Sequence, residues 1–182
     1  MIFNNPTLPS YELNQYINKL GNNIVGCEIG VCHAENFCHM LEVCDNITKL
    51  IGIDPYIEYA DFNGYVADGQ VQNFKEVTFQ NLEKINAGDR AEIRIMTSDD
   101  AVTTIDDASL DFIFIDGNHS HEYVQRDVNN YYAKVRVGGI FAGHDYSMSS
   151  VSSVLKTFLE ENNIPFEKLK LLQNDSWMLF KE

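Results

Sequence analysis

The sequence has few basic residues and no long apolar run, and each shortage excludes a class of partner. Its 182 residues include 13 Lys and Arg against 27 Asp and Glu, a formal net charge of -14. Because a nucleic-acid backbone is bound through a basic surface, we expect no nucleic-acid partner and a small neutral or cationic one instead. No stretch approaches the roughly 20 apolar residues of a membrane helix, and residues 1–9 lack the pattern of a signal peptide. These absences predict a soluble, cytoplasmic protein with no membrane partner.

Cysteine is also scarce, and its distribution does not fit a disulfide framework. The four cysteines all lie within residues 27–44, whereas the disulfides of small secreted proteins are spread along the chain. We therefore expect free thiols. The pairs Cys32-His33 and Cys38-His39 lack the spacing of a zinc site, and Phe37, Met40, Leu41 and Cys44 recur at helical spacing, which predicts a buried helix face.

The order of apolar and polar segments predicts an α/β fold in one domain, residues 1–182. Apolar runs rich in Val, Ile and Phe predict strands at residues 24–28, 49–54, 91–96, 110–116 and 139–144. Segments of helical period lie at 34–44, 74–86, 99–105, 122–134 and 149–162, with a further helix at about 9–20 before the core, 24–182. The tail, 166–172 and 176–180, reads as a hairpin. We expect a Rossmann-like three-layer sandwich with a mostly parallel seven-stranded sheet and a C-terminal antiparallel hairpin.

Local features mark several boundaries of these elements. Ser98 followed by two acids is typical of a helix N-cap, and Gly138-Gly139 is typical of a helix end before the fifth strand. Tyr123 and neighbouring residues predict a helix opened by His121 and Glu122. Trp177 is expected in the core. Residues 56–73 lack periodicity and follow a strand end, so they form either a lid or an ordinary surface excursion.

The turn after the first strand is the first candidate ligand site. The strand ends in Glu28-Ile29-Gly30, and a glycine here permits a tight strand-to-helix turn and close approach of a ligand to the backbone. Cys32 and Ala34 stand where a dinucleotide motif has its later glycines, which disfavours a bound pyrophosphate.

A carboxylate at the end of the second strand is the second candidate. Asp54 lies 26 residues after Glu28, and an acid at this place can accept the hydroxyl protons of a ribose. The alternative is a turn or capping role for Asp54. The combination with the Gly30 turn favours an adenosine-containing ligand.

Longer motifs carry a family resemblance. The runs V-G-C-E-I-G-V-C-H-A, I-G-I-D-P, T-S-D-D-A, L-D-F-I-F-I-D-G-N-H-S-H-E-Y-V-Q-R-D and G-G-I-F-A-G-H-D-Y occur in that order over about residues 24–146. They resemble the class I S-adenosylmethionine-dependent methyltransferases, above all the small-molecule O-methyltransferase branch that includes macrocin-type sugar O-methyltransferases.

The resemblance implies S-adenosylmethionine as cofactor and assigns its contacts. The methionine end would meet the Gly30 turn, the ribose would meet Asp54, and Ser98 with Asp99 would lie beside the adenine. The full set of implied cofactor-binding residues is Glu28, Ile29, Gly30, Asp54, Pro55, Ser98, Asp99 and Asp116. Asn36 departs from the pattern, because a small hydroxyl residue near this position often helps to hold the methionine.

Candidate groups for the chemistry follow the fourth and fifth strands. Methyl transfer to an alcohol needs an aligned acceptor and removal of its proton. We expect His119, His144 and Asp145 to be catalytic, with either imidazole as general base if no metal is used. Asp116, His144 and Asp145 are also candidate ligands of a divalent metal ion. In the resembling branch the position of His144 is an acid, so its imidazole disfavours magnesium and leaves Mn, Fe, Zn or no metal open.

The predicted function is O-methylation of a small hydroxylated acceptor, a class that includes saccharides. The acceptor pocket must come from the N-terminal segment, residues 56–73, the loop after Asp145, or a second subunit of a homo-oligomer. Two alternatives remain open from the sequence. One is a nicotinamide-dependent oxidoreductase, and the other is a non-catalytic module that binds S-adenosylmethionine without turnover.

Overall fold

The computed structural model describes residues 1–3, 5–57 and 70–182, and its centre is one sheet of seven strands. The spatial order is β3-β2-β1-β4-β5-β7-β6. The strands are β1 (Ile24–Ile29), β2 (Ile47–Ile53), β3 (Ala91–Arg94), β4 (Leu110–Ile115), β5 (Val135–Gly143), β6 (Lys170–Leu171) and β7 (Trp177–Phe180). The first five pair in parallel, and β7 pairs antiparallel with both β5 and β6. The predicted sheet and its antiparallel C-terminal pair are confirmed.

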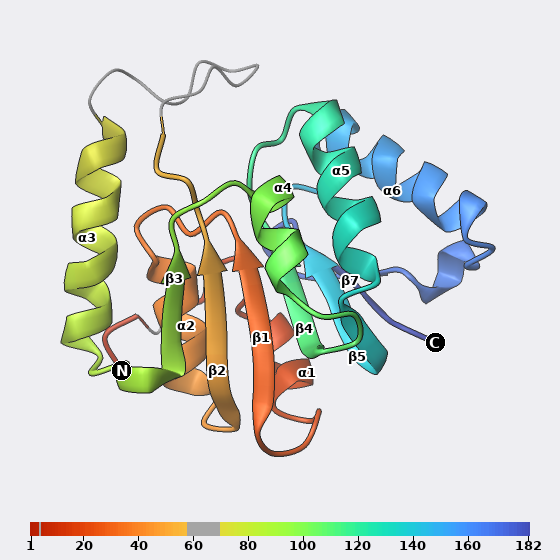
Figure 1. Cartoon of the computed structure of the whole chain (residues 1–182). Helices are drawn as coiled ribbons and strands as arrows, with labels where there is room; N and C mark the ends of the chain where they lie inside the picture. Colours follow the sequence, from red (N-terminus) through yellow and green to blue (C-terminus); the bar gives the residue numbers. More distant parts are fainter. Residues whose placement is uncertain (4, 58–69) are drawn as a thin grey trace.

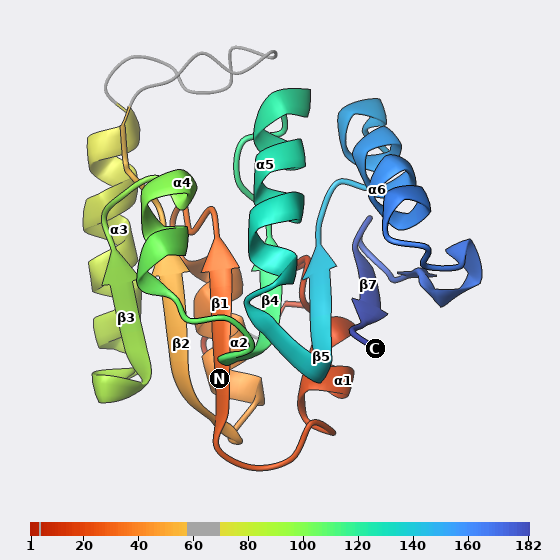
Figure 2. The ribbon, with the colours of Figure 1, turned by 45° about the vertical axis from the view of Figure 1, so that its right-hand side comes forward.

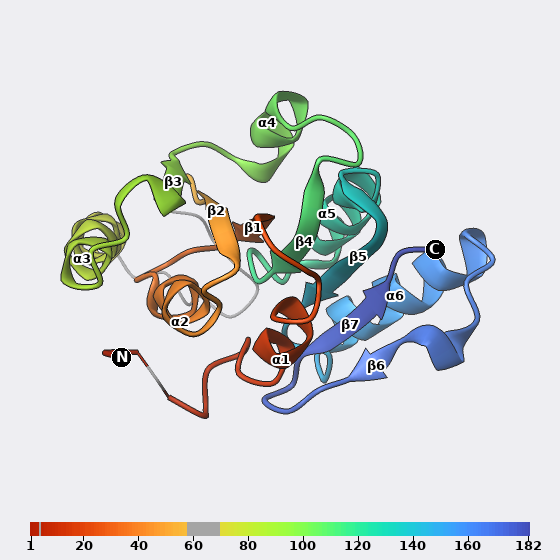
Figure 3. The same ribbon diagram turned by 90° about the horizontal axis from the view of Figure 1, so that it is seen from below.

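Helices cover both faces of this sheet (Figures 1 and 2). They are α1 (Leu13–Ile17), α2 (Glu35–Val43), α3 (Gln70–Lys84), α4 (Ser98–Ala101), α5 (His121–Tyr132) and α6 (Ser149–Glu161), with 3-10 turns at Gly88–Arg90, Val102–Thr104 and Phe166–Lys168. Helices α4, α5 and α6 share a buried cluster with Ile113 and Phe141, and α1 and α2 share another with Phe112 and Phe114. Neighbouring residues of β4 thus enter opposite cores, which explains why the strand reads as one continuous apolar run. The view from below separates the two helix layers (Figure 3).

Three predicted boundaries are wrong. The N-terminal helix is short, Leu13–Ile17 rather than about 9–20, and before it the backbone of Pro9 and Ser10 is bound by the side chains of Ser176 and Asn36. The N-cap of α4 is Thr97, not Ser98, since the Thr97 hydroxyl accepts from the amide of Asp100.

The glycine pair before the fifth strand also has a different role. It lies inside β5, which begins at Val135, and the pairing of β5 with β4 shifts register between Leu110 and Phe112. Gly138 has a φ of +76° at this irregularity, a conformation that glycine adopts without strain. The glycines therefore mark a bulge, not the end of a helix.

The expectations for the cysteines, Trp177 and the start of α5 are confirmed. All four cysteines are free, Trp177 is buried in the core, and α5 begins at His121. Residues 56–73 are the predicted lid or excursion, and most of them, 58–69, lie outside the described residues. Within the described ranges, no helix combines the length and apolar character needed to cross a membrane.

The parallel strands end at one edge of the sheet, and this edge positions the candidate residues. The arrowheads of β1, β2 and β5 point to the same side in Figures 1 and 2. Between β1 and β4 the strand order reverses, and open α/β sheets bind ligands in the crevice at such a reversal.

Candidate functional site

A cavity of about 500 Å³ opens at this edge and contains most of the predicted site. Its walls include the predicted residues Glu28, Gly30, Asp54, Asp116, His119, His144 and Asp145. They come from the ends of β1, β2, β4 and β5. A single hollow therefore joins the predicted cofactor residues to the predicted catalytic residues.

The Gly30 turn lies directly against the end of β4. Gly30 has a φ of +85°, and a Cβ added there would stand 2.0 Å from the carbonyl oxygen of Asp116. The turn continues with left-handed backbone at Cys32 and Ala34. Only glycine fits at position 30, because both the backbone conformation and the contact exclude a side chain.

Asp54 braces this turn from the second strand. Its Oδ2 accepts hydrogen bonds from the amides of Val31 at 3.1 Å and Cys32 at 2.9 Å, and its Oδ1 accepts one from Tyr56 at 2.8 Å. Burial raises the pKa of Asp54, and these amides partly offset the effect. A carboxylate has about four acceptor positions, so Asp54 combines the turn role that the sequence left open with capacity for one ligand hydroxyl.

Glu28 is the clearest sign that a ligand belongs here. Its side chain is 1% exposed, and Oε1 accepts a hydrogen bond of 2.7 Å from Nδ2 of Asn36. Oε2 has no hydrogen-bond partner among the described residues. Burial raises the pKa of Glu28 well above its ordinary value, against the lowering effect of Asn36. A buried acceptor on a cavity wall without a donor fits a ligand that carries an ammonium or hydroxyl group.

Asn36 lies near the position where the resemblance predicts a small hydroxyl residue. Its Nδ2 donates to Glu28, and its Oδ1 accepts from the amide of Ser10 at 2.9 Å. Both ends of the amide are thus bonded within the protein. Asn36 holds Glu28 in place and ties it to the N-terminal segment.

Two carboxylates and two imidazoles converge at the other end of the cavity. His119 Nε2 lies 2.8 Å from Oδ2 of Asp145, and His144 Nδ1 lies 3.0 Å from the same oxygen. Both imidazoles also face Oδ1 of Asp116, at 3.5 and 3.4 Å. Asp116, His144 and Asp145 each offer a ligand atom within 4.8 Å of the others, as a metal site requires.

The charges in this cluster depend on one another. Burial lowers the pKa of His119 and His144, but hydrogen bonds and charges from Asp116 and Asp145 outweigh burial and raise these values to about 9 and about 10. Burial raises the pKa of Asp145, and the two imidazoles outweigh it and hold the carboxyl below its usual range. The cluster is therefore built around positive charge, which protons or a metal cation can supply.

The ring of His144 has a fixed orientation. Its Nε2 lies 2.8 Å from the carbonyl oxygen of Asn174, which can only accept, so Nε2 donates. The other nitrogen, Nδ1, then faces Asp116 and Asp145. In the neutral ring Nδ1 carries a lone pair, the form in which imidazole binds a metal.

Four predicted cofactor residues are not on the cavity wall. Ile29 is buried in β1, and Pro55 directly follows Asp54. Ser98 and Asp99 begin α4, where Asp99 forms an ion pair of 2.7 Å with Arg126. Their contacts with a cofactor remain predictions.

The sequence pointed to the N-terminal segment and to the loop after Asp145 as sources of the acceptor pocket, but it named none of four further residues of the site. Leu8, Pro9 and Met148 line the cavity, and Asn174 supports His144 from the turn before β7. Met148 lies three residues after Asp145, so the sequence alone indicates that the two are close. Nothing in the sequence near Leu8 or Asn174 indicates that these distant segments meet.

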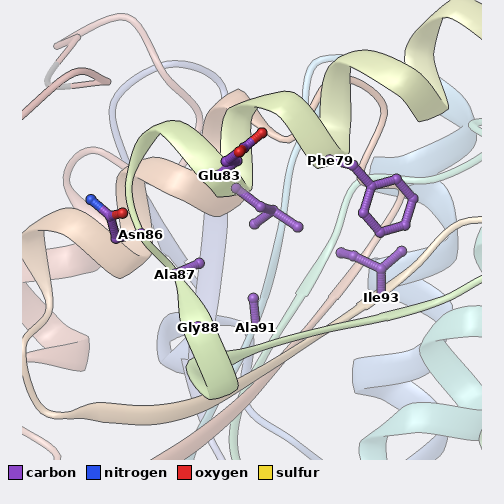
Figure 4. A pocket seen from close by; sticks show the side chains of 8 residues that line it. Phe79, Glu83, Asn86, Ala87, Gly88, Ala91 and Ile93 are labelled. Carbon is purple, nitrogen blue, oxygen red and sulfur yellow. The ribbon is translucent and has the colours of Figure 1, made fainter.

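A second hollow of about 480 Å³ lies between α3 and β3, away from the ends of β4 and β5. Figure 4 shows Phe79 of α3 above Ile93 of β3, with Ala87 and Ala91 along its floor. Glu83 is its only ionisable wall residue among those described. The candidate site is therefore the cavity at the sheet edge.

Comparisons with known proteins agree with this geometry. Residues 27–146 match the methyltransferase domain model. An uncharacterised protein of Acanthamoeba polyphaga mimivirus is 31% identical over 122 residues, which cover 65% of this chain and 50% of that protein. The chain thus matches about half the length of this relative.

Solved structures share the fold at low sequence identity. The O-methyltransferase NovP is 15% identical with a TM-score of 0.68, and the match covers 94% of this chain and 80% of NovP. TomG of Streptomyces achromogenes, an O-methyltransferase of tomaymycin synthesis solved with S-adenosylmethionine, is 12% identical with a TM-score of 0.64, covering 95% and 81%. The matched family model spans the Gly30 turn, Asp54 and the cluster at Asp116 and Asp145, and the chain belongs to the methyltransferase domain family.

Proposed function

We propose that this protein is an S-adenosylmethionine-dependent O-methyltransferase of a small hydroxylated acceptor. The observation that carries the proposal is the continuity of the cavity. Its one end offers Glu28 and Asp54 to a cofactor, and its other end holds two imidazoles and two carboxylates suited to proton removal. The match to the methyltransferase family and the likeness to NovP and TomG support the same reaction.

The cofactor end suits the two polar parts of S-adenosylmethionine. When bound, the cofactor supplies a methyl group whose bond to sulfur breaks as the acceptor oxygen bonds to its carbon, leaving S-adenosylhomocysteine. Glu28, whose Oε2 has no hydrogen-bond partner in the part of the chain that the structure describes, would hold the amino group of the methionine end. Asp54 would accept a ribose hydroxyl at its remaining position, while Ile29, Pro55, Ser98 and Asp99 would flank the adenosine.

The catalytic end would orient the acceptor and take its proton. His119 faces the cavity, and a cation held at Asp116 and Asp145 would offset the negative charge that raises the pKa of His119, so its neutral imidazole would be our choice of general base. Asp116, His144 and Asp145 would hold a divalent cation, which supplies charge that lowers the pKa of a bound hydroxyl. Because His144 contributes nitrogen, Mn²⁺, Fe²⁺ or Zn²⁺ fits this set better than Mg²⁺.

The acceptor would lie against the wall formed by Leu8, Pro9 and Met148. Leu8 and Pro9 are joined to the turn that supports His144, and the amide of Met148 donates to the carbonyl of Asp145 at 2.9 Å. These apolar residues therefore stand beside the cluster. They fit the ring or carbon skeleton of an acceptor whose hydroxyl points at His119.

Two measurements test this proposal. Calorimetric titration with S-adenosylhomocysteine and with NADH should show binding of the first and not of the second, and tighter NADH binding would favour the oxidoreductase alternative. Transfer of labelled methyl from S-adenosylmethionine to catechol should then be measured with EDTA and after addition of Mn²⁺. We expect activity that EDTA removes and Mn²⁺ restores. Cofactor binding without transfer would reject catechol as the acceptor, and activity indifferent to EDTA would reject the metal.

A further inference from the structure

The turn between β6 and β7 contacts both the N-terminal wall of the cavity and His144. It contains Asn174 and Asp175, whose φ values of +56° and +60° are left-handed. Asn and Asp tolerate this conformation better than other side chains, and two successive left-handed residues are typical of a tight hairpin turn. The sequence Gln-Asn-Asp-Ser at positions 173–176 therefore suits the turn locally. Its contacts outside the hairpin go beyond what the turn itself requires.

The first set of contacts holds the N-terminal segment. Nδ2 of Asn174 donates to the carbonyl oxygens of Pro6 at 2.8 Å and Leu8 at 2.9 Å. The hydroxyl of Ser176 donates to the carbonyl of Pro9 at 2.8 Å. Residues 5–10 have no helix or strand of their own, so these bonds fix where Leu8 and Pro9 stand on the cavity wall.

The second set of contacts holds the catalytic end. The carbonyl oxygen of Asn174 accepts from Nε2 of His144 at 2.8 Å. The carboxylate of Asp175 accepts from the amide of Ser147 at 2.9 Å and from its hydroxyl at 2.6 Å, which holds the loop after β5. The same short turn thus orients the His144 ring and the loop that contains Asp145.

We propose that Asn174 is a positioning residue that sets the acceptor wall and the His144 ring relative to each other. This inference rests on the proposed function, since it assigns an acceptor to the wall at Leu8 and Pro9. The two roles belong to different atoms. The side-chain amide places the wall, and the backbone carbonyl places the ring.

A pair of substitutions separates the two roles. Asn174→Gly keeps a left-handed backbone and its carbonyl but removes the amide that binds Pro6 and Leu8. Asn174→Asp also keeps the conformation, and it places a carboxylate against two carbonyl oxygens. Asn163 is the matched control, because it is an asparagine with a φ of +54° in the loop after α6. Asn163→Gly therefore repeats the backbone change away from the site.

Two measurements that need no acceptor come first. Hydrogen exchange of the Leu8, Ser10 and Tyr11 amides should speed up about tenfold or more in both Asn174 variants, and it should not change in Asn163→Gly. In spectra of ¹⁵N-histidine-labelled protein, the Nε2 proton of His144 should keep its wild-type signal in Asn174→Gly. Wild-type exchange of these amides in both Asn174 variants would overturn the inference.

Kinetics then test the effect on the acceptor. In Asn174→Gly the KM for catechol should rise about tenfold while kcat stays within about twofold, as expected for lost ground-state positioning. The affinity for S-adenosylhomocysteine should match the wild type. A fall in kcat with an unchanged KM would contradict the assignment of the wall. If the wild type binds S-adenosylhomocysteine but does not methylate catechol, the proposed function fails with this acceptor, and the exchange and NMR results still decide the role of Asn174.

Discussion

The two ends of the cavity are built in different ways. At the cofactor end, the Gly30 turn and the Asp54 carboxylate interact through backbone amides only 22 and 23 residues apart in sequence. The acceptor end comprises the wall at Leu8 and Pro9 and the cluster around His144. There Asn174 binds Leu8, which is 166 residues away in sequence, and His144, which is 30 residues away. The cofactor end is thus a local motif, whereas the acceptor end is assembled from remote segments.

The ends also differ in their electrostatics. Burial raises the pKa of Glu28 and Asp54, whose hydrogen-bond donors among the described residues are all neutral. Asp145 has two imidazoles beside it, and its pKa is held low. A ligand can therefore supply the positive charge that would stabilise the carboxylates of the cofactor end. The acceptor end already includes imidazoles, which carry a positive charge when they take up a proton. This difference is the one that the proposed function expects between a binding subsite and a catalytic one.

The largest expected effect concerns the Gly30 turn at the cofactor end, which should not tolerate a side chain. Gly30→Ala should lower the affinity for S-adenosylhomocysteine more than about 100-fold, because its Cβ meets the Asp116 carbonyl and the φ of +85° strains the backbone. Gly21→Ala is the control, since Gly21 has a φ of +114° with nothing within 4 Å of an added Cβ. Calorimetry with thermal unfolding as a check on folding measures the difference. Equal affinities in the two variants would remove the turn from the site.

A pH titration of stability extends the electrostatic comparison to α5. Burial raises the pKa of Asp127, beside Ser98, from 3.8 to about 6. Between these values the folded state binds more protons than the unfolded state, so stability falls as pH rises from about 4 to 6. At about 1.4 kcal/mol per pH unit, this group destabilises the protein by about 3 kcal/mol at pH 7.

Asp127→Asn should lack this part of the pH dependence. The measurement is the free energy of unfolding in urea at pH 4 and pH 7, without cofactor, for both proteins. We expect the wild type to lose more stability than the variant over this range. Identical pH profiles would show that Asp127 is solvated, contrary to its 3% exposure.

Glu28→Gln tests the charge at the cofactor end with little change of shape. The substitution keeps an oxygen but removes the negative charge that would face the amino group. A hydrogen bond to a charged group is worth about 1.5–3 kcal/mol, so affinity for S-adenosylhomocysteine should fall about 10- to 100-fold. Glu161→Gln, on the exposed end of α6, is the matched control. An unchanged affinity would mean that Glu28 is structural only.

Truncation of the apolar wall should have the smallest effect and should spare the cofactor. Met148→Ala removes side-chain contact worth about 1 kcal/mol, so the KM for catechol should rise about fivefold with little change in kcat. Leu171→Ala removes an exposed side chain of β6 and serves as control. Weaker S-adenosylhomocysteine binding in Met148→Ala would place this residue at the cofactor end instead.

The sequence was most informative where structure is local. The apolar runs predicted the parallel strands, and Glu28-Ile29-Gly30 with Asp54 identified a turn that folds against its neighbouring strands. The order of the motifs placed Asp116, His119, His144 and Asp145 at one edge, because parallel strands joined by helices end on the same side. Errors arose where a local pattern had two meanings, as with Gly138-Gly139, which forms a bulge within β5 rather than ending a helix.

By itself, the sequence determined the sheet, the edge that contains the candidate site and the identities of the groups that meet there. Only the tertiary structure decided that Asn174 joins Leu8 to His144. Within the local motif, it also decided which atoms the side chains of Asn36 and Asp54 bind, because packing fixes side-chain conformations. The physical reason is range. Strands and tight turns follow from neighbouring residues, whereas hydrogen bonds between segments 30 to 166 residues apart exist only after the core has packed and fixed their distance.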